Sequence, residues 1–381
     1  MKKILIVHPS SDLYGSDKIL INILKNMHNI NYTLIIPKNG PLIDILKKEF
    51  PNIQLFIYRQ LPIIARKNFG IIGIFNFIIS MIKFKIFLKK KNLTNPDILY
   101  CNTLATTPIS LFFHKTYKII HVHEILNNKS IIHKIINKTA TKLYQQIICV
   151  SQAVNNNLKE VASFSEKNKL ITIHNGISFK DSKLITTQNF EVDKSKINFA
   201  LIGRIKPEQK GQILFINAIA QLPKNLLDKA HFYLIGSTVQ GQEYMLDEVQ
   251  KTIQHLKLEN TIEIIPFIKN IETVYKAIDV SVVPSLIEDS FPTTVLESMY
   301  FGKPVIGTKI GGIPEMIIND VTGFTFPVND TIKLTKYITF FIQNPQQISI
   351  MGAEGKNTYQ NKFSIEIFNQ KFTKLLYNLI N

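Results

Sequence analysis

Two carboxylates in the second half of the chain are spaced so that both could face one ligand. Asp289 follows a β-branched run that Pro284 ends, because proline has no N–H to donate to a neighbouring strand. Glu297 lies eight positions later, in a pattern that predicts a helix over 293–300 with Gly302 as its C-cap. Open α/β sheets bind ligands at the carboxyl ends of their strands. We therefore expect both carboxylates to line a pocket at such an edge.

A further strand is predicted over 304–308, and Gly311 and Gly312 follow it after two residues. Glycine lets the backbone approach another group closely, because it has no Cβ atom. We expect this glycine loop to lie against the same ligand.

Two cations flank an earlier strand-to-helix turn. Arg204 follows Gly203 at the end of an apolar stretch, and Lys210 comes six positions later, just before another apolar helix pattern. Two cations beside a helix N-terminus suit a diphosphate, since the helix dipole adds partial positive charge there. A solvated loop could show the same spacing, but the paired carboxylates favour a binding site. Glu297 could then accept both hydroxyls of a ribose, and Asp289 would be left for a sugar.

In the first half, two histidines end a predicted strand over 118–122. His121 and His123 should point to the same side of this strand and Val122 to the other. The sequence provides no further ligands that would make a metal site with them. Each histidine is either a hydrogen-bonded structural residue or part of an active site, and its place at a strand end favours the second interpretation.

The turn after the first strand places Gly15 and Ser16 just before an amphipathic helix. Small residues at a helix N-terminus leave backbone N–H groups for an anion. A plain turn with an N-cap would look the same, so this pair is a candidate phosphate contact only in combination with other groups.

Strand and helix patterns alternate through both halves of the chain. In the first half strands are predicted at 3–7, 32–36, 53–57, 97–101, 118–122 and 146–150, and in the second half within 197–203, 231–236, 261–267, 279–285, 303–308 and 323–326. Such alternation is typical of α/β folds with a parallel sheet covered on both faces. The fold class is therefore predicted to be α/β, with two Rossmann-like parallel-sheet domains.

The length of 381 residues is also more than one ordinary core requires. A polar stretch over 175–195, which contains Asn-Gly, is the best linker candidate. We expect one domain over 1–185, a second over 186–363, and a closing helix over 364–381 that could pack across both.

Composition narrows the setting in which the protein works. Cys101 and Cys149 each adjoin an apolar run, which indicates buried, reduced thiols rather than a disulfide. The apolar run after Lys2 and Lys3 is too short for a signal peptide, so we expect a cytoplasmic protein. The formal net charge of +17 is either compositional drift or a means of attraction to anionic membranes or phosphorylated ligands. Nucleic acid is not expected, because the basic residues are dispersed and no nucleic-acid motif accompanies them.

The stretch 69–88 is the most apolar of the chain and runs into three lysines, 89–91. Its length would span a bilayer, but Asn76, Lys83 and Lys85 interrupt it. A helix packed on the sheet and a helix lying on a membrane interface are the alternatives to a transmembrane span.

These motifs together carry a resemblance to a known family. The second half resembles the nucleotide-binding domain of family 4 retaining glycosyltransferases, which have the GT-B architecture of two facing Rossmann-like domains with an interdomain cleft. The matching landmarks are Gly203-Arg204 with Lys210-Gly211, PSLIEDSFPTTVLESM over 284–299, and GKPVIGTKIGGIPEMI over 302–317. The first half is similar in order but looser, through LYGSDKIL, HVHE, VSQAV and IHNGI.

The resemblance implies a role for each candidate. Arg204 and Lys210, with Gly203 and the Gly15–Ser16 turn, would bind the diphosphate, and Glu297 the ribose. The donor sugar would be contacted by Asp289, Ser290, Phe291, Pro292 and Thr293. His123, rather than His121, matches the active-site histidine of the family. Glu288 is an alternative to Asp289, because that family usually has a glutamate where this chain has the shorter aspartate.

The activity that the resemblance implies is transfer of a sugar from a nucleoside-diphosphate sugar to an acceptor hydroxyl with retention, without a metal ion or other cofactor. The acceptor is expected to be a lipid-linked glycan at the inner membrane surface, as in O-antigen, capsule or lipopolysaccharide synthesis. A nucleotide-sugar 2-epimerase of related architecture and a non-catalytic nucleotide-sugar binding module are the alternatives.

Overall fold

The computed structural model describes residues 2–13, 15–27, 31–65, 70–178 and 190–380. The chain folds into two compact units, Met1–Gly176 with Ile365–Asn381, and Ile177–Ser364. The predicted boundary between 185 and 186 lies outside the described residues. The closing helix is part of the first unit, together with the N-terminal strands.

The first unit contains a seven-stranded parallel sheet in the order β3-β2-β1-β4-β5-β6-β7. Its strands are β1 Lys3–Val7, β2 Asn31–Ile36, β3 Gln54–Ile57, β4 Ile98–Asn102, β5 Tyr117–Val122, β6 Gln146–Cys149 and β7 Leu170–Thr172. The first six match the predicted strands to within a residue or so. β7 was not predicted, because its three residues are too few to show a period.

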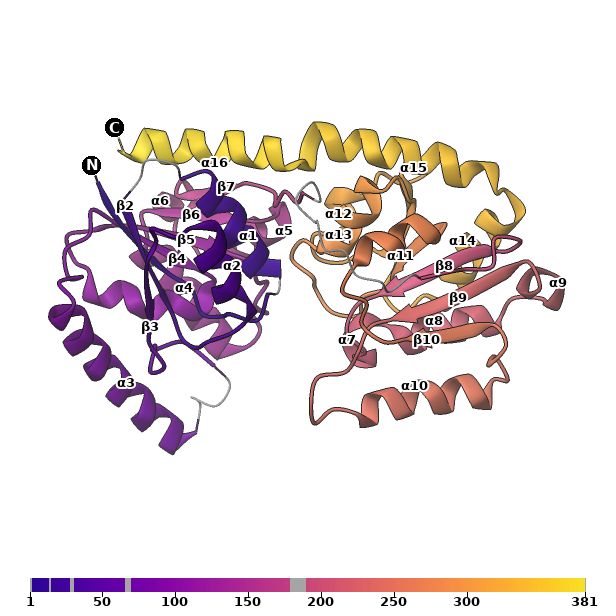
Figure 1. Cartoon of the computed structure of the whole chain (residues 1–381), viewed down its shortest axis with the longest axis horizontal. Helices are drawn as coiled ribbons and strands as arrows, with labels where there is room; N and C mark the ends of the chain where they lie inside the picture. The colour runs from indigo at the N-terminus through magenta and orange to yellow at the C-terminus, as the bar shows by residue number, and fades with distance from the viewer. Residues whose placement is uncertain (1, 14, 28–30, 66–69, 179–189, 381) are drawn as a thin grey trace. The chain divides into compact units, whose positions relative to one another are not determined.

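Helices cover both faces of this sheet (Figure 1). They are α1 Gly15–Lys25, α2 Pro41–Glu49, α3 Ile71–Lys90, the 3₁₀ helix η2 Leu104–Phe112, α4 Ile131–Leu143, α5 Gln152–Lys159, α6 Phe164–Lys167 and α16 Ile365–Ile380. α16 lies beside α1 (Figure 1). It buries Phe368, Phe372 and Leu376 in the same core as the strand residues. The ammonium of Lys2 also donates to the carbonyl of Leu379 at 3.0 Å. The helix predicted from the apolar period after Ser364 is therefore confirmed.

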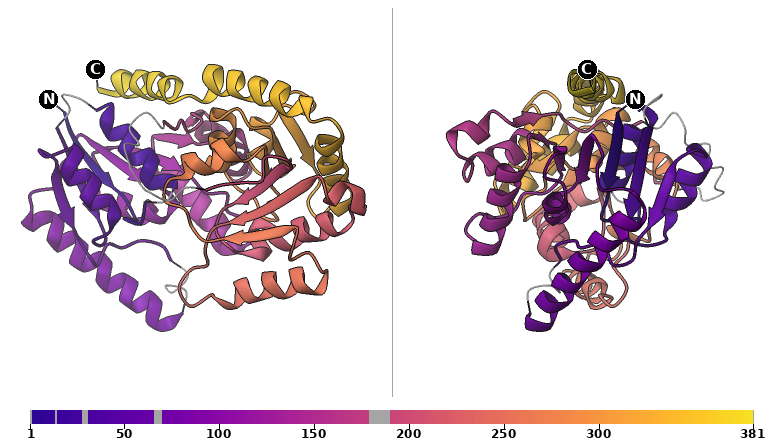
Figure 2. Two further views of the ribbon diagram at one scale, coloured as in Figure 1. Left: turned by 45° about the vertical axis from the view of Figure 1, so that its right-hand side comes forward. Right: turned by 90° about the vertical axis from the view of Figure 1, so that its left-hand side faces the viewer.

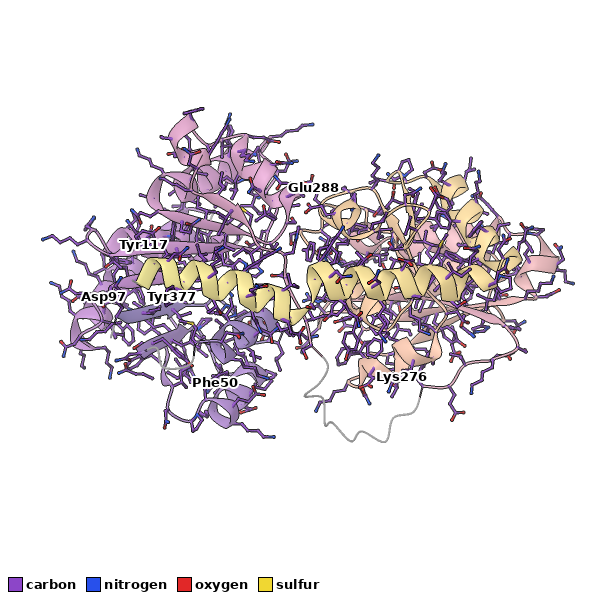
Figure 3. The ribbon with its side chains drawn as sticks, turned by 90° about the horizontal axis from the view of Figure 1, so that it is seen from above. Phe50, Asp97, Tyr117, Lys276, Glu288 and Tyr377 are labelled. Carbon is purple, nitrogen blue, oxygen red and sulfur yellow. The ribbon has the colours of Figure 1, made fainter. Side chains whose placement is uncertain are left out.

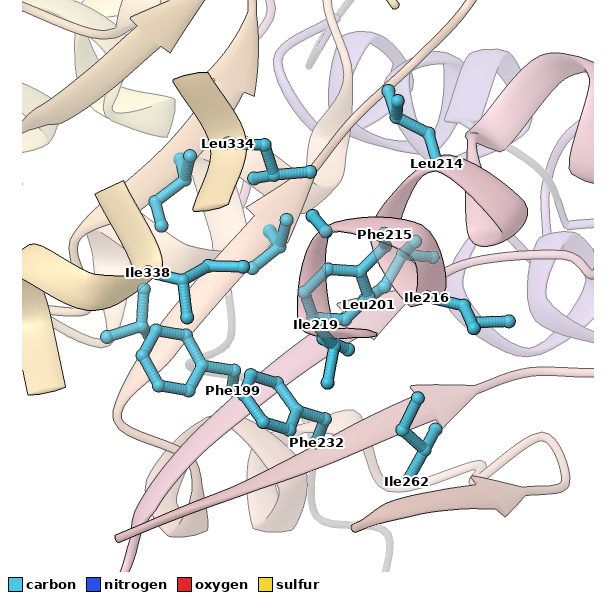
Figure 4. Close-up of a cluster of buried hydrophobic side chains, with 14 of the residues drawn as sticks. Phe199, Leu201, Leu214, Phe215, Ile216, Ile219, Phe232, Ile262, Leu334 and Ile338 are labelled. Atoms are coloured by element: carbon cyan, nitrogen blue, oxygen red, sulfur yellow. The ribbon is translucent and has the colours of Figure 1, made fainter. Parts of the chain in front are cut away.

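The second unit has a six-stranded parallel sheet in the order β10-β9-β8-β11-β12-β13. Its strands are β8 Ile197–Ile202, β9 Ala230–Ile235, β10 Ile262–Ile265, β11 Val280–Val283, β12 Val305–Thr308 and β13 Gly323–Phe326. Its helices are α7 Pro207–Lys210, α8 Gln212–Ala220, α9 Lys224–Leu227, α10 Tyr244–His255, α11 Ile271–Ala277, α12 Thr293–Tyr300, α13 Ile313–Met316, α14 Thr331–Gln343 and α15 Gln346–Thr358, followed by the π-helical turn η3 Tyr359–Phe363. The aromatic rings of Phe199, Phe215 and Phe232 pack at the centre of its core (Figure 4).

Each sheet reverses its strand order once. In the first unit the reversal lies between the neighbouring strands β1 and β4, and in the second between β8 and β11. In open α/β sheets, ligands usually bind at the carboxyl ends of the strands beside such a reversal. All candidate residues of the sequence analysis that are described lie in or near segments that follow strands at these edges.

We predict that Phe372→Ala destabilises the first unit by about 3 to 5 kcal/mol, the usual cost of removing a buried phenylalanine ring. Phe372 is 1% exposed and contacts the rings of Phe368 and Tyr100. Hydrogen exchange of the β1 amides under denaturant would measure the loss. Tyr377→Ala on the same helix is the control, because Tyr377 is exposed and its loss should cost no more than about 0.5 kcal/mol (Figure 3). Equal losses would contradict the docking of α16.

Candidate active site

The turn after β8 is shaped by glycines. Gly203 has φ +155° and its N–H donates to the carbonyl of Ile235 at 2.9 Å. A Cβ atom on Gly236 would lie 1.9 Å from the carbonyl oxygen of Gly203, so the two turns touch backbone to backbone. The side-chain amide of Gln212 donates to the carbonyl of Arg204 at 2.8 Å. The turn is therefore fixed by buried contacts, while the Arg204 side chain is exposed.

Gly211 joins this turn to the neighbouring strand β11. It separates α7 from α8 with φ +73°, and a Cβ atom there would lie 2.0 Å from the carbonyl oxygen of Pro284. The N–H of Leu286 donates to the carbonyl of Gln209 at 2.9 Å. Loops that follow two non-consecutive strands are thus held together.

Lys210 and Asp289 form an ion pair across these two loops. The Lys210 Nζ atom lies 2.8 Å from Asp289 Oδ2, and the side chains are 37% and 23% exposed. The structure therefore brings together one predicted cation and one predicted carboxylate, which are 79 residues apart in the chain. Both groups remain partly accessible to a ligand.

The glycine loop after β12 contacts the backbone of Asp289. Gly312 donates its N–H to the carbonyl of Asp289 at 2.8 Å. Gly311 has φ +56°, and a Cβ atom on it would lie 2.3 Å from that same carbonyl oxygen. These glycines are predicted to lie against a ligand, and in the structure they closely approach the backbone of Asp289. The two glycines position the carboxylate.

The residues around Asp289 differ in exposure. Glu288 is exposed at the surface of the second unit (Figure 3), whereas Asp289 contacts Lys210. The Phe291 ring is buried against Phe363, at 5.5 Å between ring centroids, and Pro292 is buried as well. Ser290 and Thr293 are partly exposed. Phe291 therefore anchors the loop with its side chain, and the loop can offer only its backbone there.

Glu297 lies on α12, which spans the predicted helix 293–300, and is 6% exposed. Its Oε2 atom accepts a hydrogen bond from the Tyr275 hydroxyl at 2.9 Å. Burial, and then the neighbouring Glu297, raise the pKa of Tyr275 well above its usual value of 10. Tyr275 is therefore a proton donor at any physiological pH and fixes the carboxylate of Glu297.

The first unit has its own polar cluster at the reversal of strand order. His8 follows β1, Asn102 ends β4 and His123 follows β5, and these strands are neighbours in the sheet. The Asn102 Nδ2 atom lies 2.8 Å from His8 Nδ1, and its Oδ1 atom lies 2.8 Å from His123 Nε2. His8 Nε2 is paired with the carboxylate of Asp17 on α1. One connected network therefore runs from α1 to the end of β5.

Both predicted histidines are kept neutral by burial. The rings of His121 and His123 lie on the same side of the strand end, with centroids 4.2 Å apart, as predicted. Burial, and then the neighbouring histidines 121 and 8, lower the pKa of His123 well below 6.5. Burial lowers the pKa of His121 to about 3, and His121 Nδ1 lies 2.8 Å from the Tyr100 hydroxyl. His121 is inaccessible and His123 partly exposed, so only His123 can meet a ligand.

Ser16 belongs to the same cluster. It lies at the start of α1, and its carbonyl oxygen is 3.4 Å from Asn102 Nδ2. Gly15 is exposed beside it. Within the described residues, no group of three or more histidine, cysteine, aspartate or glutamate side chains is arranged to hold a metal ion. Cys101 and Cys149 are free and buried, as predicted.

α3 is long and apolar enough to cross a membrane by length and composition. Its C-terminal half is packed, because Phe84 and Phe87 contact Tyr58 on the segment after β3. The rest is largely exposed at the edge of the first unit (Figure 2). The exposed apolar residues are Ile71, Ile72, Ile74, Phe75, Ile78, Ile82 and Ile86. Phe69, at the start of the predicted stretch, lies outside the described residues.

Most of the second unit matches a known family. Residues 183–358 match the family of glycosyl transferases group 1. The uncharacterized glycosyltransferase MJ1178 of Methanocaldococcus jannaschii is 30% identical over 236 residues, which span 60% of this chain and 58% of that protein. The match to the glycosyl transferases group 1 thus lies in the second unit.

Two further proteins are similar over most of this chain. The UDP-Gal:alpha-D-GlcNAc-diphosphoundecaprenol alpha-1,3-galactosyltransferase of Escherichia coli is 25% identical, over 87% of this chain and 85% of that protein. The crystal structure of Alr3699/HepE of Anabaena in complex with UDP and glucose has a TM-score of 0.79 and 20% identity, covering 99% of this chain and 100% of that one. This likeness confirms the predicted fold class of two Rossmann-like parallel-sheet units.

Four residues of the polar clusters were not predicted from the sequence. His8, Asp17 and Asn102 join His123 in the first unit, and Tyr275 holds Glu297 in the second. A signal was present for His8 and Asn102, because polar residues at the ends of strands next to an order reversal are candidates by position. Using it requires the strand order, which the sequence does not reveal.

We predict that Gly311→Ala destabilises the second unit by more than Gly241→Ala does. Both glycines have positive φ, +56° and +82°, so both variants carry similar backbone strain of about 1 to 2 kcal/mol. Only at Gly311 would the new Cβ atom collide with the backbone of Asp289, since nothing lies within 4 Å of the corresponding position at Gly241. Urea unfolding of the two variants gives the comparison. Equal losses would show that the Gly311 contact with Asp289 is not tight.

Proposed function

We propose that the protein is a retaining glycosyltransferase of family 4, which moves a sugar from a nucleoside-diphosphate sugar to an acceptor hydroxyl. The observation that carries this proposal is the Lys210–Asp289 pair beside Arg204 at the strand-order reversal of the second sheet. It combines groups for a diphosphate and for a sugar within one site. Alr3699/HepE, which has the same fold, binds UDP and glucose, in agreement with such a donor.

The cations would act on the leaving group. As the bond from the anomeric carbon to the phosphate oxygen breaks, negative charge develops on the diphosphate. Arg204 and Lys210 would neutralise that charge, and fixed electrostatic groups of this kind often make the largest contribution to catalysis. Lys210 is paired with Asp289 without a donor, and the incoming diphosphate would draw Lys210 toward itself. This chemistry requires no metal ion, and we propose that none takes part.

The remaining candidates would position the donor. Glu297, fixed by the Tyr275 hydroxyl, would accept hydrogen bonds from the ribose hydroxyls. Asp289, the loop 290–293 and His123 would contact the sugar, while Glu288 stays in solvent. The N-terminus of α1 at Gly15 and Ser16 would offer backbone N–H groups to phosphate.

Retention would follow from the leaving group acting as base. The departing phosphate oxygen accepts the proton of the acceptor hydroxyl on the face that it leaves, and the acceptor oxygen bonds to the anomeric carbon on that same face. The products are the glycosylated acceptor and the nucleoside diphosphate, so atoms and charge balance. No protein nucleophile is needed.

We further propose a lipid-linked glycan as the acceptor, in the synthesis of a bacterial surface polysaccharide such as O-antigen, capsule or lipopolysaccharide. The name of the Escherichia coli relative specifies a diphosphoundecaprenol-linked acceptor. The protein would work in the cytoplasm, peripherally on the inner face of the membrane.

The exposed face of α3 supports that location. Seven large apolar side chains on one helix are costly in water and gain free energy at a membrane interface. Five lysines lie among and just after the last of them, toward the C-terminal end of the helix, where anionic lipid headgroups would lie: Lys83, Lys85, Lys89, Lys90 and Lys91. The net charge of +17 would also attract the protein to an anionic membrane surface.

Incubation with UDP-, GDP- and ADP-sugars, with and without a membrane extract, tests the proposed activity. Release of nucleoside diphosphate that depends on the extract is expected of the transferase. Interconversion of the sugar without release would instead indicate a 2-epimerase, and binding without turnover under both conditions a non-catalytic module. Either result would overturn the proposal.

We predict that Glu297→Gln weakens binding of the nucleoside diphosphate about tenfold or more, because a carboxylate that accepts two hydroxyls is replaced by an amide that can accept at only one atom. Calorimetric titration with UDP, GDP and ADP measures the effect. Glu259→Gln, an exposed carboxylate on the same unit, is the control with unchanged affinity. An unchanged affinity in Glu297→Gln would mean that the ribose lies elsewhere.

We predict that the protein floats with phosphatidylglycerol vesicles at low salt and that Ile72→Glu with Phe75→Glu abolishes this. Both side chains are mostly exposed, so the changes should leave the fold intact. Phe164→Glu is the control, because Phe164 is an aromatic residue on α6 that is 89% exposed, more than Ile72 at 78% and Phe75 at 64%. If wild-type protein fails to float, or the control loses flotation to the same extent, α3 is not the membrane-binding element.

A further inference from the structure

A chain of buried polar groups connects α1 to His123 in the first unit. Asp17, His8 and Asn102 are fully buried, at 0% exposure, yet each has polar partners within the chain. Burying such groups is costly unless their hydrogen bonds are satisfied, and a satisfied network specifies one arrangement. The arrangement here can be assigned atom by atom.

The first link sets the tautomer of His8. The carboxylate of Asp17 can only accept, so the His8 Nε2 atom that contacts it must carry the proton. The Ser10 hydroxyl also donates to Asp17, at 3.2 Å. His8 Nδ1 then has the lone pair and accepts from the Asn102 Nδ2 atom at 2.8 Å.

The second link sets the orientation of the Asn102 amide. Nitrogen and oxygen of an amide can be interchanged unless a partner distinguishes them. The carbonyl oxygen of Ser16 lies 3.4 Å from Asn102 Nδ2 and can only accept a hydrogen bond. It therefore requires the amide nitrogen on that side, which is the orientation that His8 also requires. Asn102 Oδ1 therefore faces His123 Nε2 at 2.8 Å and can only accept. His123 must carry its proton on Nε2.

We infer that Asn102, oriented by His8 and Asp17, is a positioning residue that holds His123 as the neutral Nε2–H tautomer with its ring fixed at the end of β5. His123 then has its lone pair on Nδ1. The significance of this tautomer for turnover rests on the proposed function, in which His123 contacts the donor sugar. The tautomer itself does not depend on that function.

Long-range ¹H–¹⁵N correlation spectra of the full chain with ¹⁵N-labelled histidine test the inference, because the protonated and bare ring nitrogens resonate far apart. His123→Gln assigns the signals. Wild-type protein should show His123 as the Nε2–H tautomer. Asn102→Leu removes the acceptor and should give a mixture of tautomers, whereas Asn102→Asp keeps an acceptor oxygen and should retain the Nε2–H form.

A variant of Asp17 tests the far end of the hydrogen-bond network. Asp17→Asn replaces an obligate acceptor by a group that can also donate, so the Nε2–H fraction of His123 should fall. Asn155→Leu is the control, since Asn155 is a buried amide of the same unit that donates to Thr172 at 3.0 Å. Its His123 pattern should match the wild type. An Nδ1–H tautomer in the wild type, or unchanged patterns in both Asn102→Leu and Asp17→Asn, would overturn the inference.

Turnover of UDP-glucose separates this inference from the proposed function. Loss of the outer hydrogen-bond partner of a metal-bound histidine commonly costs about 10- to 100-fold in activity, and we expect a loss at the lower end of that range here. Asn102→Leu should lower kcat by about tenfold or more with little change in KM, and Asn102→Asp should recover most of it. If the spectra are as expected but His123→Ala turns over UDP-glucose like the wild type, the role proposed for His123 fails while the positioning chain stands.

Discussion

The ion pair between Lys210 and Asp289 is the contact on which the candidate site of the second unit depends. It joins loops that follow strands β8 and β11, which are neighbours in the sheet but far apart in the chain. The pair is possible only because glycines let the supporting backbones touch, Gly211 against Pro284 and Gly311 against Asp289. A Cβ atom at either glycine would force these loops apart. The electrostatics of the site thus depend on backbone packing.

In the first unit, buried hydrogen bonds hold together the residues at the strand-order reversal. Its strand-order reversal also brings together loops from distant parts of the chain, and the groups found there are a carboxylate, two histidines and an amide. Burial keeps His123 neutral, so its two ring nitrogens are chemically distinct. The second unit thus pairs the charges of Lys210 and Asp289 near its surface, whereas the first unit orients the neutral ring of His123 through buried hydrogen bonds.

Much of this organisation could be predicted from the sequence, because it depends on local patterns. The strands, the helix carrying Glu297 and the closing helix after Ser364 follow from apolar period and from proline and glycine signals. The partners of the site residues could not be predicted, since they lie on strands whose order in the sheet is a tertiary property. His8 beside Asn102 and Tyr275 beside Glu297 are of this kind. The exposure of α3 could not be predicted either, because whether an apolar helix packs on the sheet depends on its tertiary neighbours.

A crystal structure with a bound nucleoside-diphosphate sugar tests the central claim most directly. The account predicts the diphosphate within hydrogen-bonding distance of Arg204 and of a Lys210 ammonium released from Asp289, with the ribose hydroxyls on Glu297 and the sugar on Asp289. A nucleotide bound away from the turn after β8, or a sugar held by Glu288 while Lys210 stays paired with Asp289, would contradict it.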